Sequence, residues 1–137
     1  MSDTVRKVEY FALEVPNKPG EGARILEALR TSGINLLAFT GFPSGRKAQI
    51  DFVPENVDAF KAAAKAAKLK LRPKKFGFLV QGDDRHGAVA GLLKTLADAK
   101  INVTAIDAVS AGMGRYGAIL WVQPRDVNKA AKALGAI

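Results

Sequence analysis

The sequence contains an internal repeat, and this feature limits the possible folds more than any other. Residues in the first half match residues 67 positions later, in the same order: Phe11 with Phe78, Gly20 with Gly87, Leu26 with Leu93, Leu29 with Leu96, Ile34 with Ile101 and Asn35 with Asn102. Ordered self-similarity of this kind indicates a repeated structural unit. Further along, Pro54 matches Pro124, an offset of 70, so the second copy carries an insertion that we expect in a hairpin.

Both copies have the same order of predicted elements. Alternating apolar residues predict a first strand, and leucines at helical spacing predict a helix after it. Two extended runs joined by a glycine-containing turn come next, and a proline separates them from a second helix. The first strands are predicted at 8–15 and 75–81, and the hairpins at 34–42 with 48–53 and 101–110 with 118–123.

A fourth strand is predicted in the first copy only. Residues 68–72 alternate leucines with basic residues, whereas the second copy ends soon after its second helix. Strand, helix, strand, strand, helix, strand is the order of a ferredoxin-like unit, an antiparallel sheet with both helices on one face. We therefore predict an α+β protein of two such units, repeat 1 at 1–73 and repeat 2 at 74–137, the latter with its last strand short or missing.

The two units are expected to pack together. A unit of about 60 residues buries only a marginal core by itself. Residues 119–122 read Ile-Leu-Trp-Val, so both faces of that predicted strand are apolar. A strand with two apolar faces is expected where both faces of its sheet are covered.

The composition narrows the possible functions. No apolar run approaches the roughly 18 to 20 residues that span a bilayer, and the start of the chain lacks the apolar core of a secretory signal. We therefore expect a cytoplasmic protein without membrane contact. The chain has no cysteine, and His86 is its only histidine. These counts leave few nucleophile and base pairs for catalysis, so we predict neither an enzyme nor a cofactor or metal site.

The formal charge of +8 is concentrated at residues 61–75, which contain seven lysines and arginines and no acid. Such a segment is typical of partners with negative charge, so a nucleic-acid-binding ferredoxin-like protein is the alternative function. Lys61, Lys65 and Lys68 also share one helical face opposite Val57 and Phe60. That arrangement is the pattern of a solvated amphipathic helix, the interpretation we favour.

Two short motifs recur at the same places in both copies. The turn from the first strand to the first helix reads NKPGEG at residues 17–22, and the second strand begins Gly-Ile-Asn at 33–35. The second copy has DDRHGA at 83–88 and Lys-Ile-Asn at 100–102. Together these motifs resemble the ACT domain, a small amino-acid-sensing module, as a tandem pair that spans nearly the whole chain.

The resemblance implies a non-enzymatic regulatory protein. A free amino acid would bind between paired units, contacted by the strand-to-helix turn of one unit and the second strand of a neighbour. The implied ligand-binding residues are Asn17, Lys18, Pro19, Gly20 and Asn35 in the first copy and Asp84, Arg85, His86, Gly87 and Asn102 in the second. Bare sheet faces and the short second copy predict a homodimer, and an enzyme or regulator partner would respond to its ligand state.

These residue types suit the implied chemistry, and they also have a purely structural interpretation. Glycine lets a backbone approach closely, and amides at a helix start hold a carboxylate. Side-chain oxygens of Asn17 or Asp84 accept hydrogen bonds from an α-ammonium. Asn17 and Asp84 are equally typical helix caps, and Pro19 suits a first helical turn. Whether both turns bind, or only one, is left open by the sequence.

Overall fold

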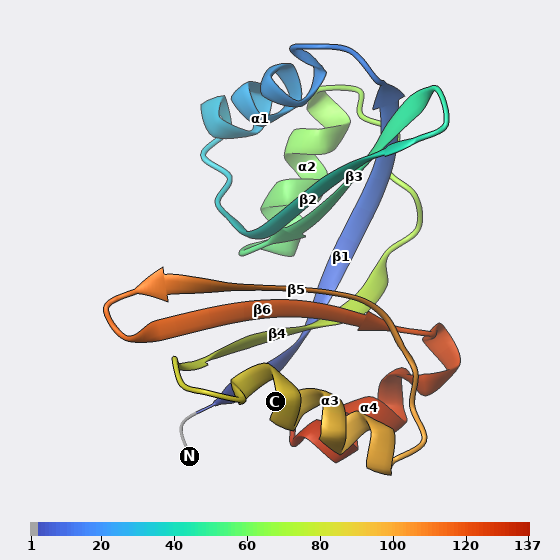
Figure 1. The fold of residues 1–137 in the computed structure, drawn as a ribbon. Coiled ribbons are helices and arrows are strands. Elements are labelled where there is room, and N and C mark those ends of the chain that lie inside the picture. The colour runs from blue at the N-terminus through green and yellow to red at the C-terminus, as the bar shows by residue number, and fades with distance from the viewer. Residues whose placement is uncertain (1–2) are drawn as a thin grey trace. The chain divides into compact units, whose positions relative to one another are not determined.

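The computed structural model describes residues 3–137, and backbone contacts divide them into two units. The N-terminal unit is Glu9–Lys75, and the C-terminal unit consists of residues 3–8 and 76–137. The long first strand, β1 (Thr4–Pro16), contributes its first half to the C-terminal unit and its second half to the N-terminal unit. Figure 1 labels the elements of both. No helix of the described residues is long and apolar enough to cross a membrane.

The N-terminal unit follows the predicted order. After β1 come α1 (Glu21–Thr31), β2 (Leu36–Ser44), β3 (Lys47–Pro54) and α2 (Val57–Ala66). β3 lies between β1 and β2 and pairs antiparallel with both, so that Phe52 lies opposite Phe11 on one side and Phe39 on the other. Both helices cover the same face of this sheet (Figure 1). Their contact with the sheet buries a core whose largest fully buried members are Phe52, Phe60, Ile25 and Leu29.

The prediction of a strand at residues 68–72 is wrong. These residues are irregular, and within the segment only the Arg72 N–H donates a backbone hydrogen bond to β1, to the Ala12 carbonyl at 2.8 Å. The segment begins with Lys68 at φ +59°, and the Leu69 N–H donates to Ala64 O at the end of α2. Pro73 follows and has no N–H to donate to a strand partner. Leu69 and Leu71 therefore alternate with basic residues because they pack against the core, not because the segment pairs as a strand.

The C-terminal unit repeats the arrangement. It contains β4 (Lys75–Asp83), α3 (Ala88–Asp98), β5 (Val103–Gly112), β6 (Arg115–Val122), a 3₁₀ turn at Pro124–Asp126 and α4 (Val127–Leu134). β6 lies between β4 and β5 and pairs antiparallel with both, with Leu120 opposite Phe78 and Ile106. β5 shifts its register between Ser110 and Gly112, a shift that β2 lacks. This accounts for one extra residue, because Phe52 and Leu120, which hold equivalent places in the two sheets, are 68 positions apart. The expectation that the whole insertion lies in the hairpin is therefore wrong: the other two residues lie between β6 and α4, where residues 123–126 replace residues 55–56 of the first copy.

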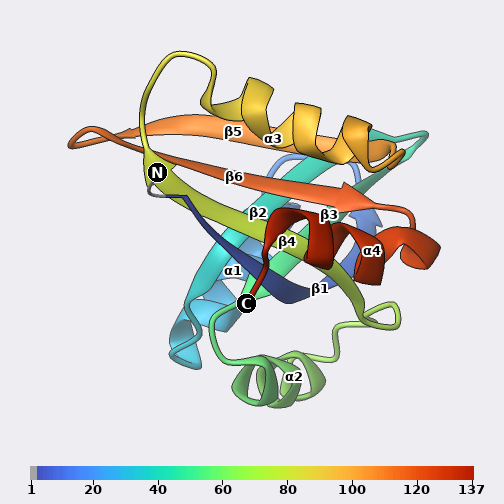
Figure 2. The ribbon, with the colours of Figure 1, turned by 90° about the horizontal axis from the view of Figure 1, so that it is seen from below.

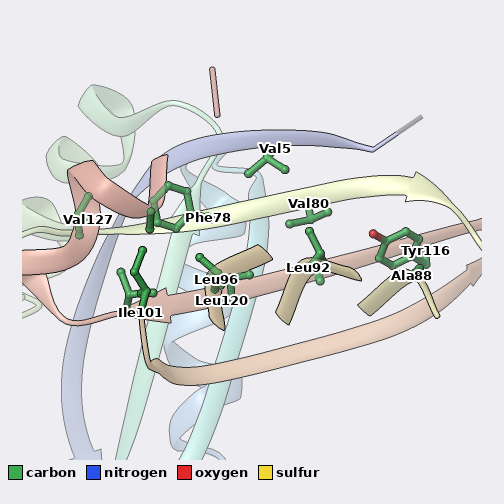
Figure 3. Close-up of a cluster of buried hydrophobic side chains, with 13 residues drawn as sticks. Val5, Phe78, Val80, Ala88, Leu92, Leu96, Ile101, Tyr116, Leu120 and Val127 are labelled. Carbon is green, nitrogen blue, oxygen red and sulfur yellow. The ribbon is translucent and has the colours of Figure 1, made fainter. Parts of the chain in front are cut away.

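The start of β1 supplies the fourth strand of the C-terminal unit. β1 neighbours β4 in the sheet, and Val5 packs in the same core as Phe78 and Val80. Figure 3 shows Val5 beside Val80, with Leu92 and Leu96 of α3 in the same cluster. The chain end also reaches β1: the Ile137 N–H donates to Val5 O at 2.9 Å, and the Lys7 N–H donates to Ile137 O at 3.0 Å (Figure 2). The last residue of the chain therefore lies beside the first half of β1 in this unit.

Candidate ligand site

The first strand-to-helix turn is shaped by a glycine. Gly20 adopts φ +92°, a left-handed conformation that side chains disfavour, and α1 begins at the next residue. Gly20 is the N-cap and provides no side-chain hydrogen bond, so the interpretation of Asn17 as a helix cap is wrong. Gly87 at φ +77° caps α3 in the same way, and Asp84 is likewise not its cap. The first amides of each helix accordingly have no partner from a capping side chain.

A pocket of about 300 Å³ lies against the first turn. We call it the turn pocket. It lies beside the start of α1. Its walls come from the end of β1, the turn, the start of α1, and the parts of β2 and β3 that face them: Val15, Pro16, Asn17, Lys18, Glu21, Gly22, Phe39, Gly41, Phe42, Pro43, Ala48 and Ile50.

The turn pocket is polar on one side and apolar on the other. Lys18 Nζ lies 3.8 Å from Glu21 Oε2, and Arg24 Nη2 lies 2.9 Å from Glu21 Oε1. On the apolar side, Phe39 is 42% exposed, which is unusual for phenylalanine. The Phe39 ring is held by a contact with the buried Phe52 ring, 5.6 Å between centroids. Opposite charges and an apolar wall therefore meet in one small space.

The structure brings only some of the predicted residues of the first copy together. Asn17 and Lys18 line the turn pocket, whereas Pro19 and Gly20 form the turn without lining it. Asn35 is exposed just before β2, where its carbonyl accepts from the Glu55 N–H at 3.0 Å. At about 3.3 Å per strand residue, the nearest wall of the turn pocket, Phe39, lies about 13 Å from Asn35 along β2. Pro43, which is level with the end of β1 just before Asn17, lies about 26 Å away. Asn17 and Asn35 of one unit therefore do not share a ligand.

Sequence reasoning missed the walls of this pocket. Glu21, Gly22, Phe39 and Phe42 line it but were not among the predicted residues. One signal was present: Phe39 and Phe42 are an odd number of positions apart in a strand, so a regular strand would place them on opposite faces. At least one of the two was thus expected outside the core.

The second turn is already occupied by contacts within the chain. The Asp84 carboxylate accepts from Ser110 Oγ at 3.1 Å, and the Asp84 N–H donates to Gly114 O at 2.9 Å. Arg85 donates from both terminal nitrogens to the Asp3 carboxylate, each at 3.0 Å, in the bidentate geometry of a strong ion pair. His86 and Asn102 are exposed, and Asn102 lies at the far end of β5. Arg85 lines a separate hollow of about 290 Å³ that includes residues of α3 and α4 and none of β5.

The Asp3–Arg85 pair has an electrostatic consequence. The hydrogen bonds from Arg85 lower the pKa of the Asp3 carboxyl below its ordinary value, against the opposing effect of burial. Burial and the neighbouring Asp3 carboxylate raise the pKa of Tyr116. The Asp3 side chain is only 5% exposed, so this pair is shielded from solvent on the carboxylate side.

We expect the Asp3–Arg85 pair to make folding stability depend on acid pH. Because the folded-state pKa of Asp3 is lowered, its stabilisation is complete above the unfolded value of about 4 and is lost as the pH falls through the folded value. Between about pH 5 and pH 2, urea unfolding of the wild type should lose more free energy than unfolding of Asp3→Asn. Asp98→Asn, which removes a surface pair with Lys94, serves as the control and should parallel the wild type. Parallel curves for the wild type and Asp3→Asn would refute the assignment.

Within residues 3–137, no three or more histidine, aspartate or glutamate side chains are grouped so that they could hold a metal ion.

Comparison with known proteins identifies the fold. No protein-family model matches this sequence, and no curated protein matches it significantly. Among solved structures, a protein from Bacteroides thetaiotaomicron is similar at a TM-score of 0.78 and 16% identity, covering 97% of this chain and 88% of that one. The regulatory subunit of aspartate kinase from Thermus thermophilus, in its ligand-free form, gives a TM-score of 0.65 at 15% identity, with 98% and 95% coverage. The Thermus flavus regulatory subunit gives 0.58 at 18%, with the same coverage.

The likeness extends over nearly the whole chain, so it concerns both units. At these identities it shows the fold alone. The α+β fold of two ferredoxin-like units predicted from the sequence is confirmed.

Proposed function

We propose that this chain is a non-enzymatic regulatory protein that binds a free amino acid in the turn pocket. The single observation that supports the proposal most is the composition of that pocket: Lys18 and Glu21 on one side, and the exposed Phe39 on the other. Its volume of about 300 Å³ lies at the small end of the range for ligand sites, which suits an amino acid. The fold, shared with regulatory subunits of aspartate kinase, is consistent with such a role.

An amino acid zwitterion matches the polar side of the pocket. The Lys18 ammonium and the first-turn amides of α1, including that of Gly22, attract the α-carboxylate. The Glu21 carboxylate and the Asn17 amide oxygen accept hydrogen bonds from the α-ammonium. Lys18 and Glu21 pair with each other over 3.8 Å at the surface, and pairs of this kind contribute only about 0–1 kcal/mol. A ligand can therefore replace their mutual contact at small cost.

The apolar side of the pocket favours an amino acid with an apolar side chain. Phe39 and Pro43, which lie on the same face of β2, offer a surface from which such a side chain would displace water. Burial of apolar area contributes about 25 cal/mol per Å², so leucine-sized and aromatic side chains gain most. Acidic side chains would gain nothing from this wall.

The site is proposed in the first copy. In the second copy, Asp84 and Arg85 hold Ser110 and Asp3, and a ligand there would have to break the bidentate pair. We therefore propose one ligand per chain. Asn35 and Asn102 lie too far from the turns of their own units to contact a ligand bound there. Either asparagine can contact such a ligand only in the turn of a neighbouring unit. We propose that a second copy of the chain supplies it, as a homodimer.

Regulation would follow from differential binding. A ligand that binds one quaternary arrangement more tightly shifts the population toward it. We propose that a separate enzyme or regulator responds to that arrangement, by analogy with the regulatory subunits of similar fold. With one histidine and no cysteine, the chain has little to offer as a catalyst. Its cytoplasmic location stays a prediction.

A thermal-unfolding screen of the twenty amino acids tests the proposal. A specific ligand at 100 times its dissociation constant should add about 2.7 kcal/mol to the free energy of unfolding. Glu21→Gln should raise the dissociation constant of the stabilising amino acid at least tenfold, about 1.4 kcal/mol, because the α-ammonium loses its charged partner. Glu27→Gln is the matched control, since Glu27 lies on the same helix, pairs with Arg30 and does not line the pocket. The absence of any stabilisation in a folded sample would count against amino-acid binding.

A further inference from the structure

A second hollow, larger than the turn pocket, lies elsewhere in the N-terminal unit. It has a volume of about 590 Å³ and shares no lining residue with the turn pocket. One wall is α2, and the other is the irregular segment 69–74 that follows it (Figure 2). The hydrogen bond from the Arg72 N–H to Ala12 O holds this segment against β1. We call this space the basic hollow.

Five cations line the basic hollow, and none of its lining residues is acidic. Lys61 and Lys65 lie one turn apart on α2, while Lys70, Arg72 and Lys74 alternate along the facing segment. Arg72 pairs with Glu14 at 3.2 Å and Lys74 with Glu9 at 3.0 Å. In the part of the chain that the structure describes, Lys61, Lys65 and Lys70 form no ion pair.

This charge pattern differs from that of α1 and α3. On α1, Glu21 pairs with Arg24 and Glu27 with Arg30, and on α3 Lys94 pairs with Asp98. On α2 the corresponding positions 61 and 65 are both lysine, and like charges at this spacing destabilise a helix by a few tenths of a kcal/mol. A bound anion would turn this repulsion into attraction. Charge of one sign around a hollow also concentrates anions from solution.

The floor of the hollow is apolar. Ala64, Leu69 and Leu71 line it between the cations. Phe11 also lines it, but at 4% exposure its ring belongs to the core and offers no face on which a nucleobase could stack. Binding of single-stranded nucleic acid normally uses such exposed aromatic faces along a basic groove. The geometry is that of a site for one compact molecule.

We propose that the basic hollow binds a small polyanionic metabolite, one that carries two or more phosphate or carboxylate groups on a short carbon skeleton. Lys61 and Lys65 contact the anionic groups from α2, and Lys70 contacts them from the facing segment. The carbon skeleton lies over Leu69 and Leu71. This site is independent of amino-acid binding in the turn pocket, so either can exist without the other.

Isothermal titration calorimetry with two probes, inorganic tripolyphosphate and citrate, tests the proposal on the full chain. At least one probe should bind with one site per chain, and its affinity should fall as salt is raised. The double variant Lys61→Gln/Lys65→Gln should lose roughly tenfold or more in affinity, because two charge-assisted contacts are removed. The preferred probe distinguishes a phosphorylated ligand from a polycarboxylate.

The matched control is Lys129→Gln/Lys132→Gln on α4, which removes the same charge from exposed positions outside the hollow. It should change the affinity less than about threefold, since long-range charge is screened. Equal losses of affinity in the two double variants would show that binding depends on net charge alone and would overturn the proposed site. Failure of both probes to bind would overturn it as well. A third result would overturn it too: a 20-nucleotide single-stranded RNA binds more tightly than either probe, and its binding depends on Lys61 and Lys65. That result would favour a nucleic acid as the ligand.

Discussion

Phe60→Ala will lower the free energy of unfolding of the N-terminal unit by about 3–5 kcal/mol. Phe60 of α2 is 0% exposed, and its ring lies 5.3 Å from that of Phe11 and 5.4 Å from that of Phe52. Truncation removes these contacts and leaves a cavity at the centre of a small core, where few side chains can move to fill it. The loss would be measured by urea denaturation and by hydrogen exchange of the β3 amides.

Phe42→Ala is the control for this prediction. Phe42 is 42% exposed and lines the turn pocket, so its truncation creates no enclosed cavity and should cost less than about 1 kcal/mol. Equal destabilisation by Phe60→Ala and Phe42→Ala would contradict the assignment of core and pocket in this unit.

Val5→Asp will destabilise the C-terminal unit by about 4 kcal/mol or more, the range expected when an unpaired charge is buried. Val5 is 6% exposed in a core with Phe78 and Val80 (Figure 3). The strand that carries it is separated from β4 by most of the N-terminal unit in sequence, yet completes the sheet of the C-terminal unit. Protection of the β4 and β6 amides from hydrogen exchange should fall sharply.

Thr4→Asp provides the comparison for Val5→Asp. Thr4 is the adjacent residue of the same strand and is exposed, so the same carboxylate placed there stays solvated and should cost less than about 1 kcal/mol. If β4 and β6 keep equal protection in Thr4→Asp and Val5→Asp, the start of the chain does not serve as the fourth strand of that unit.

Local patterns predicted most elements of this fold because each repeat contains them in sequence order. The alternation at Phe11 and Leu13 and the leucine spacing of α1 are short-range signals, and repetition of the signals made the ferredoxin-like arrangement predictable. Strand pairing at the sheet edges was not predictable in this way. Residues 68–72 alternate like a strand but do not pair as one. The segment around Val5 has little alternation, yet it pairs because the neighbouring edge of β4 is open to it.

The candidate site was predictable only in its turn. Gly20 and Gly87 match between the copies because both adopt positive φ at a helix start, a requirement that acts on one residue at a time. The pocket wall at Phe39 depends on how β2 and β3 lie against the turn before α1, which is a property of packing. The contact of Asp3 with Arg85, 82 residues apart, depends on the start of β1 lying beside β4. The difference between the two turns therefore became visible only in three dimensions.

The most direct test of the account is a ¹⁵N-amide NMR titration with the amino acid that stabilises the chain most. If the turn pocket binds it, the amide chemical shifts of Lys18, Glu21, Gly22 and Gly41 will change along one common saturation curve. The amide chemical shifts of Arg85 and Gly87 will not follow that curve. Glu21→Gln should displace the curve to higher ligand concentration, and Glu27→Gln should leave it in place. A saturable shift confined to the second turn, or no saturable shift near Gly22, would contradict amino-acid binding at the first turn.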